Sequence, residues 1–264
     1  MIWILAYVLA GIVIGFFAGL LGIGGGMTLV PILAALFTAQ QFIPEHVMHL
    51  ALGTSMAAVM FTGSSAVREH HKLGSVDWQV VKRLAPPMAL GTMTSALAAG
   101  WLPQKTLAVA FAVIIVGAAT QIWIGKKPGP GRQLPGAPGL WAVGLGIGVV
   151  SGLVSAGGAF LSMPFMLWCG VPARTAIGTG AALGLPVAVL GTLGYISSGW
   201  TVPSLPAGSL GFVLLPALAG VVLASMWMAP IGARLAHRLP VATLRRTFAV
   251  VLYLLAAKMV VSYA

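Results

Sequence analysis

The sequence predicts an all-α integral membrane protein, because it is strongly apolar, nearly free of acidic residues and divided into runs of spanning length. Its 264 residues are 59% hydrophobic and only 6% charged, and several apolar runs approach the ~20 residues that a helix needs to cross a bilayer. Fourteen Lys and Arg stand against three acidic residues, for a net charge of +11. Since most basic residues lie between the apolar runs, we interpret them as topology signals and attraction for anionic lipid or solute, with no nucleic-acid partner.

The first half, residues 1–124, predicts four hydrophobic segments. The first, 2–37, contains the glycine cluster of "GLLGIGGGMTLVP" (19–31), so we expect it to be broken, as a re-entrant or discontinuous helix. The next three predict ordinary spanning helices at 47–67, 84–102 and 106–124. The run "REHHK" (68–72) directly follows the second segment and reads as a solvated loop, not a metal site, since no second ligand cluster accompanies it.

A linker and a second set of four segments follow. Residues 125–139, "GKKPGPGRQLPGAPG", are rich in glycine, proline and basic residues and predict a connection rather than a helix. The second half, residues 140–264, predicts segments at 140–168, 172–198, 207–232 and 242–262. The first of these again contains a glycine cluster, at 157–158. About 15 residues precede it and about 10 follow, so neither arm alone reaches the roughly 30 Å of a hydrocarbon core.

The two halves are similar to each other in sequence. "GFFAGLLGIGGGMTLVPIL" (15–33) aligns with "GVVSGLVSAGGAFLSMPFML" (148–167), "LGTS" (52–55) with "IGTG" (177–180), and "LPQKTLAVAFAVIIV" (102–116) with "LPVATLRRTFAVVLY" (239–253). The order of the matches is kept while the spacing changes. We therefore predict two structural repeats, 1–124 and 140–264, separated by the linker.

The distribution of charge predicts how the repeats are oriented. If all eight segments cross fully, the basic residues divide 8 to 6 between the two sides. If the two broken segments enter and return on one side, the division becomes 12 to 2, with only Lys105 and Lys258 outside. The positive-inside rule favours the second arrangement, which makes the halves inverted repeats.

The glycine clusters are the predicted binding site. Non-helical backbone at membrane depth must face protein or a water-filled cavity, and a helix that begins there presents unpaired N–H groups and a positive dipole end that favour an anion. Short hydroxyl side chains nearby suit a small oxyanion, and one cationic candidate stands near each repeat's entrance. The predicted substrate-binding residues are Gly24, Gly25, Gly26, Met27, Thr28, Thr54, Ser55, Gly157, Gly158, Ala159, Ser162, Thr179, His49 and Arg174.

Other glycines have a different predicted role. Gly11, Gly15 and Gly19, and likewise Gly144, Gly148 and Gly152, recur at four-residue spacing. This spacing indicates close packing between helices rather than a ligand site. A purely structural bend remains the alternative interpretation for the consecutive glycines of the two clusters.

The paired glycine-rich segments with a trailing proline, the motifs "LGTS" and "IGTG", and "GSVDW" (74–78) resemble the TauE/SafE family of membrane anion permeases. The resemblance covers nearly the whole chain. It implies transport, mostly export, of sulfite or small organosulfonates across the cytoplasmic (inner) membrane of a bacterium by a multi-pass protein. The second half departs from the first, with Ser155 for Gly22, Ala159 for Gly26 and Gly180 for Ser55.

Several other functions fit the sequence less well. No acid lies inside a segment and Cys169 is the single cysteine, so we expect no enzyme, no metal ligand set and no cofactor. Any proton coupling would then need His49 or an ionisable substrate. The alternatives to sulfite or organosulfonate export are a permease for another small anion or a metal cation, or a membrane assembly partner without transport. Direction, coupling ion and oligomeric state stay open, a homo-oligomer included.

Overall fold

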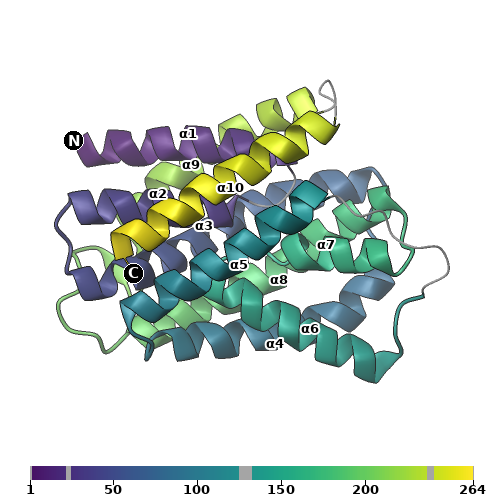
Figure 1. Cartoon of the computed structure of the whole chain (residues 1–264), viewed down its shortest axis with the longest axis horizontal. Coiled ribbons are helices and arrows are strands. Elements are labelled where there is room, and N and C mark those ends of the chain that lie inside the picture. The colour runs from purple at the N-terminus through teal and green to yellow at the C-terminus, as the bar shows by residue number, and fades with distance from the viewer. Residues whose placement is uncertain (1, 22–24, 125–132, 237–240, 264) are drawn as a thin grey trace.

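The computed structural model describes residues 2–21, 25–124, 133–236 and 241–263, which form almost only α-helices (Figure 1). The first half contributes α1 (Ile2–Leu21), α2 (Gly26–Ala39), α3 (Pro44–Lys72), α4 (Trp78–Ala99) and α5 (Gln104–Ile124). The second contributes α6 (Ala137–Val154), α7 (Ala159–Trp168), α8 (Ala173–Gly199), α9 (Leu215–Ala236) and α10 (Val241–Tyr263). Strands β1 (Ser209–Leu210) and β2 (Val213–Leu214) form a small antiparallel hairpin before α9.

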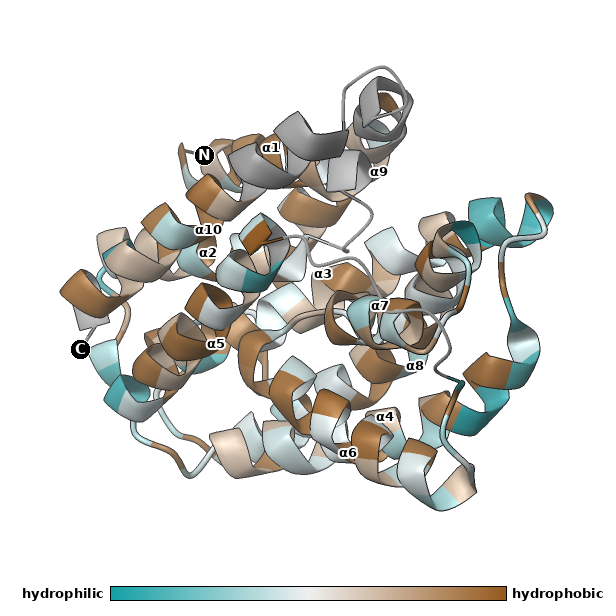
Figure 2. Ribbon diagram, turned by 45° about the vertical axis from the view of Figure 1, so that its right-hand side comes forward, coloured by the Kyte–Doolittle hydropathy of each residue, from teal (hydrophilic) through white to brown (hydrophobic). Residues whose placement is uncertain are grey.

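The fold class is that of an integral membrane protein, as the sequence predicts. Four helices within the described part of the chain are long and apolar enough to cross a bilayer, and shorter apolar helices accompany them. Their spanning stretches are Pro44–Lys72, Gln104–Gln121, Ala137–Val154 and Ala173–Gly199. Hydrophobic residues cover much of the helix surface, whereas hydrophilic residues concentrate toward one end of the molecule (Figure 2).

The helices of the two halves interlock rather than forming separate bundles. In the first half α1 packs along α9 of the second, and in the second half α6 packs along α4 of the first. The long helices α3 and α8 lie against each other at the centre, and α5 pairs with α10 on the outside. Each half therefore lends its first helix to the other half, and residues of both halves contribute to each of the two hydrophobic core clusters.

Small residues allow the two cross-half pairs to approach closely, as their spacing predicts. A Cβ on Gly15 would come within 2.6 Å of the Ser225 carbonyl oxygen on α9, and one on Gly148 would overlap the Met88 carbonyl on α4. Gly11 likewise faces the Val221 carbonyl oxygen of α9, whereas Gly144 and Gly152 face the side chains of Pro87 and Ser95 on α4. The contacts of Gly19 lie outside the described part of the structure.

Several segment boundaries differ from the sequence prediction: α4 begins at Trp78 rather than 84, and α6 begins at Ala137, inside the predicted linker 125–139. Helix α3 continues through the whole of "REHHK" to Lys72, so these polar residues form its exposed last turns and not a loop. Helix α9 begins at Leu215 instead of 207, because Gly208 and Gly211 adopt positive φ and turn the apolar run 205–214 into the hairpin. Apolar composition alone did not reveal that this stretch is buried hairpin rather than helix.

The two ends of the molecule have different composition. The turn between α2 and α3, the end of α4 and the β1–β2 hairpin share one end, since the His49 ring contacts the Leu102 carbonyl and the Phe212 ring. We call this the hairpin end. The turn between α3 and α4 meets the start of α8 at the opposite end, where the Asp77 N–H reaches Thr179. We call it the basic end, because it carries the exposed residues Arg68, Lys72, Lys82, Arg83 and Arg174.

Candidate functional site: two broken helices that meet inside the protein

Each half contains one interruption between two helices. Helix α1 ends at Leu21 and α2 begins at Gly26, while α6 ends at Val154 and α7 begins at Ala159. Gly25 caps α2 with φ +68° and ψ −9°, a left-handed conformation that glycine adopts at little cost. Ser155 ends α6 in the same region, with φ 50°. Gly24 lies outside the described residues.

The two interruptions are in contact with each other. A Cβ on Gly26 would overlap the carbonyl oxygen of Ser155, so the start of α2 lies directly on the end of α6. The Val59 side chain of α3 fits between them, 2.9 Å from where a Cβ on Gly157 would stand and 2.8 Å from one on Gly26. Val59 is about 22 Å along α3 from Pro44, close to the middle of the helix. The two predicted glycine clusters therefore form one structural unit in the interior.

The position of Ser155 is held by a buried hydrogen bond. Its hydroxyl donates to the Leu52 carbonyl of α3 over 2.6 Å, and the Ala156 N–H donates to the Ser151 carbonyl over 3.1 Å. A left-handed non-glycine residue is strained, and this hydrogen bond offsets part of that strain. The sequence analysis noted Ser155 only as a departure from the first half, although it fixes the second interruption against α3.

The N-terminus of α7 faces a surface of α8 that lacks side chains. A Cβ on Gly184 would have its nearest neighbour, the Gly158 nitrogen, 3.7 Å away, and one on Gly180 would lie 3.3 Å from the Ala159 Cα. Gly157, Gly158 and Ala159 are all buried. The Phe160 N–H donates to the Gly157 carbonyl over 3.2 Å. Since the other first N–H groups of a helix have no partner within it, the start of α7 is a buried, electropositive terminus packed against glycines of α8.

Buried hydroxyl groups without partners accompany this terminus. Ser162, in the first turn of α7, is 0% exposed and its Oγ has no hydrogen-bond partner, and a Cβ on Gly180 would lie 3.6 Å from that oxygen. Ser55 of α3 and Ser151 of α6 are likewise fully buried with unpartnered hydroxyls. An orphaned polar group costs roughly 1–3 kcal/mol, so the Ser162 hydroxyl is a candidate for pairing with a ligand. The Ser209 hydroxyl in β1 is also without a partner.

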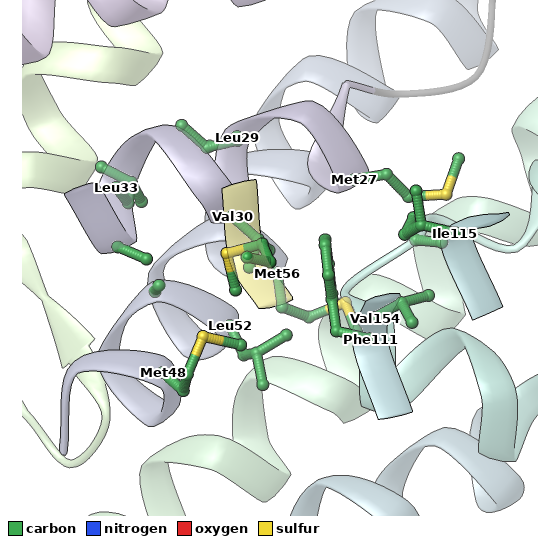
Figure 3. Packing of buried hydrophobic residues seen from close by; sticks show 14 of the residues in the cluster. Met27, Leu29, Val30, Leu33, Met48, Leu52, Met56, Phe111, Ile115 and Val154 are labelled. Atoms are coloured by element: carbon green, nitrogen blue, oxygen red, sulfur yellow. The ribbon is translucent and has the colours of Figure 1, made fainter. Parts of the chain in front are cut away.

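The start of α2 is more fully satisfied within the protein. The Thr28 hydroxyl donates to the Gly25 carbonyl over 2.8 Å, and the Leu29 N–H donates to the same oxygen over 3.1 Å. The Met27 side chain packs in the apolar core formed by α2, α3 and α5, which Figure 3 shows with Ile115 and Phe111 beside it. Of the predicted residues here, Met27 and Thr28 contribute packing and capping, and only their main chain faces the interruption.

Thr54 and Thr179 have a role that the sequence analysis did not foresee. At the hairpin end, the Leu214 N–H donates to Thr54 Oγ1 over 2.9 Å and the Phe212 N–H donates to the Tyr195 carbonyl over 3.2 Å. A Cβ on Gly53 would overlap the Phe212 carbonyl oxygen, so glycine is needed for this approach. We call this set of contacts the hairpin clasp.

The same contacts recur at the basic end between the equivalent residues of the repeat. The Asp77 N–H donates to Thr179 Oγ1 over 2.9 Å, and the Ser75 N–H donates to the His70 carbonyl over 3.1 Å. A Cβ on Gly178 would overlap the Ser75 carbonyl oxygen. We call this set the basic clasp. In each clasp, a Gly-Thr pair on the central helix of one half contacts the segment just before a helix of the other half. Gly53 and Thr54 of α3 contact the segment before α9, and Gly178 and Thr179 of α8 contact the segment before α4.

The hydroxyls of Thr54 and Thr179 therefore accept main-chain N–H groups instead of facing the interruptions. The sequence feature that marks the two clasps is a further pair of glycines at equivalent positions of the two halves, Gly74 and Gly211. Both adopt positive φ, of 63° and 54°. The segments that follow them, "SVDW" and "FVLL", share too little composition for the match to be noticed without the structure.

His49 and Arg174 lie outside the unit formed by the two interruptions. His49 is 4% exposed, and its ring contacts main-chain carbonyls at the hairpin end. Arg174 is exposed in the first turn of α8 at the basic end. The structure brings Gly26 and Gly157 together at Val59 and places Ser155 against Gly26, with Gly158, Ala159 and Ser162 following at the start of α7 against α8. It leaves these two cationic candidates at opposite ends.

A helical membrane protein with two broken helices meeting in its interior and orphaned hydroxyls beside them has the features of a membrane transporter. The family described as "Sulfite exporter TauE/SafE" matches residues 7–259, and the chain belongs to this family. It is 35% identical over 258 residues, 97% of this chain and 98% of the relative, to a probable membrane transporter protein of Haemophilus influenzae.

More distant relatives carry the same description. The chain is 29% identical over 252 residues, 93% of its length and 94% of the relative's, to the probable membrane transporter protein YdhB of Bacillus subtilis. It is 22% identical over 196 residues, 72% of each chain, to a probable membrane transporter protein of Methanocaldococcus jannaschii. No solved structure matches the chain.

Proposed function

We propose that this protein exports a small oxyanion, sulfite or a small organosulfonate, across the inner membrane of a bacterium, by alternating access around the two interruptions. The observation that carries the proposal is the buried N-terminus of α7 with the orphaned Ser162 hydroxyl beside it. A helix terminus offers N–H donors and a positive potential to an anion. The family description, which names a sulfite exporter, supports this choice of substrate.

Donors without a fixed charge suit a solute that must also be released. The main-chain N–H groups at 158–159 and the Ser162 hydroxyl would supply hydrogen bonds to several oxygens at once. No group of three or more His, Cys, Asp or Glu that could hold a metal ion occurs among the described residues. The residues that we propose to contact the anion are Gly25, Gly26, Gly157, Gly158, Ala159, Ser162 and Ser55.

The two clasps support a mechanism in which inverted repeats move against each other. Each clasp joins one half to the other at one end of the molecule, through equivalent residues of the two halves. Opening the hairpin clasp would free one end of the α3–α8 centre, and opening the basic clasp would free the other. Such an exchange around a central site is the general mode of transporters built from inverted repeats.

Transport of radiolabelled sulfite by purified protein in proteoliposomes tests the proposal, with Ser162→Ala as the diagnostic variant. We expect sulfite flux by the wild type and a roughly tenfold higher KM for Ser162→Ala, equivalent to the loss of one hydrogen bond of about 1.4 kcal/mol to a charged group. The variant's thermal stability should be unchanged or higher, because an orphaned hydroxyl is removed.

Thr192→Val provides the matched control, because the Thr192 hydroxyl donates to the Ala188 carbonyl of its own helix over 2.7 Å, away from the interruptions. Its KM should equal that of the wild type. The absence of flux above empty vesicles for sulfite and for short sulfonates would contradict the proposed substrate class.

A further inference from the structure

The His49 ring is surrounded by hydrogen-bond acceptors. Its Nδ1 lies 3.1 Å from the Glu45 carbonyl oxygen, and its Nε2 lies 3.0 Å from the Ala99 oxygen and 3.1 Å from the Leu102 oxygen. Only 4% of the residue is exposed. All three contacts are main-chain carbonyls, which accept hydrogen bonds and never donate them.

This arrangement suits one protonation state of the ring. A neutral imidazole has one N–H and one lone pair, so one nitrogen would turn its lone pair toward a carbonyl oxygen. The imidazolium donates from both nitrogens and satisfies both sides. Two of the oxygens belong to the end of α4 and the turn after it, where the negative end of the helix dipole favours a cation. The Ala99 oxygen also accepts the Leu102 N–H over 3.1 Å.

Few ionisable groups surround this ring. His46, one turn earlier on α3, has its ring centroid 6.3 Å from that of His49, and the Glu45 side chain is exposed. The facing segments, Ala99–Leu102 and the β1–β2 hairpin, contain no ionisable side chain. Lys105, at the start of α5, is exposed. His49 is the one buried histidine in the described part of the chain.

The ring is also part of the hairpin clasp. The Phe212 ring stacks on it, with centroids 4.8 Å apart and an interplanar angle of 29°, and the Phe212 N–H makes the clasp hydrogen bond to Tyr195. The basic clasp has no counterpart to this contact: Ser75 stands in the place of Phe212, and its hydroxyl lies 3.2 Å from the His70 Nδ1. The two clasps are alike in main chain but differ in side-chain chemistry.

We propose that His49 is a proton-binding site that couples proton movement to the hairpin clasp: the protonated ring holds the clasp closed, and loss of the proton releases it. The coupling to transport rests on the proposed function, whereas the proton-controlled clasp does not. When the clasp opens, the α4 carbonyls and Phe212 move away from the ring, which then loses the acceptors that hold its second proton. One proton is exchanged in each opening and closing cycle.

Hydrogen exchange of the clasp amides measures this coupling without any substrate. The Phe212 and Leu214 amides report the hairpin clasp, and the Ser75 and Asp77 amides report the basic clasp in the same molecule. Protection relative to the intrinsic rate is followed from about pH 5 to about pH 9, a range that brackets histidine titration. We expect the hairpin clasp to lose at least about tenfold protection as the pH rises. Because the His70 ring contacts Ser75 in the basic clasp, the basic clasp is compared in a His70→Gln variant, where its protection should not depend on pH.

Two variants identify the residue responsible. His49→Gln should remove the pH dependence at the hairpin clasp, whereas His46→Gln should keep it. Protection that is independent of pH in the wild type, or unchanged pH dependence in His49→Gln, overturns the proposal. If His49→Gln does not fold, the comparison between the two clasps in His70→Gln still decides.

Flux measurements test the coupling itself. In proteoliposomes, a pH gradient should stimulate radiolabelled sulfite flux by the wild type several-fold, and His49→Gln should lose this stimulation while retaining sulfite exchange at equal pH. Full stimulation in His49→Gln overturns the coupling. If sulfite is not transported at all, the proposed substrate fails, and the exchange experiment still decides whether His49 controls the clasp.

Discussion

Single glycines at the two interruptions meet different neighbours. Gly26 lies against a main-chain carbonyl, that of Ser155, which cannot move without displacing α6. Gly158, at the equivalent interruption, would place a Cβ 2.6 Å from the Met88 Cε, the flexible end of a side chain. Although both belong to the same sequence motif, only Gly26 is required by close main-chain contact.

Gly26→Ala should therefore destabilise the protein, whereas Gly158→Ala should be tolerated. We expect a loss of about 1–3 kcal/mol for Gly26→Ala, the usual effect of forcing extra volume into a packed interior. Gly146→Ala on the outer face of α6, where a Cβ has no neighbour within 4 Å, is the control and should be neutral or stabilising. Thermal unfolding followed by tryptophan fluorescence measures all three, and equal stability of the Gly26 and Gly146 variants would rule out the contact between the interruptions.

At the scale of the helices, the clasps explain why the motifs "LGTS" and "IGTG" contain both glycine and threonine. The glycine of each pair admits a carbonyl oxygen of the facing segment, and the threonine then accepts an N–H two residues further along that segment. Threonine alone could not accept this N–H, because the main-chain N–H of the facing segment comes within hydrogen-bond distance of the threonine hydroxyl only where the glycine allows the two backbones to touch. The pair is thus a joint between two helices of different halves.

Thr54→Val should weaken the hairpin clasp more than Thr179→Val weakens the basic clasp. The Thr54 bond to the Leu214 N–H is buried, whereas the Thr179 bond to the Asp77 N–H is only partly buried. An unpaired buried N–H costs roughly 1–3 kcal/mol, and water reduces that cost at the basic end. Hydrogen exchange at Leu214 and Asp77 measures the effect, and Thr54→Ser should restore protection because it keeps the hydroxyl. A Thr54→Val variant with wild-type exchange at Leu214 would show that the clasp does not depend on this bond.

At the scale of the whole molecule, composition and repeats predicted the class of protein well, because bilayer length and apolar content leave few alternatives to helices. In the structure α1 ends at Leu21 and α6 at Val154, next to the two glycine clusters, since consecutive glycines remove the side chains that favour a helix. The sequence could not predict that Thr54 and Thr179 bind main chain, nor that 205–214 forms a buried hairpin, because both depend on contacts between segments over 100 residues apart. Ser155 and Val59 were missed for the same reason.

The arrangement of the ends leads to a prediction about topology. The contact between Asp77 and Thr179 puts Arg83 and Arg174 at the same end of the molecule, and the positive-inside rule makes this the cytoplasmic end. In a Cys169→Ala background, single cysteines at exposed Arg83 and Arg174 should react with a membrane-impermeant maleimide only after cells are permeabilised. Cysteines at exposed Thr201 and Lys105, at the hairpin end, should react in intact cells. A protein in which all eight segments cross would place Arg83 and Arg174 on opposite sides, so labelling of only one of them in intact cells would refute both the inverted arrangement and the rocking mechanism that depends on it.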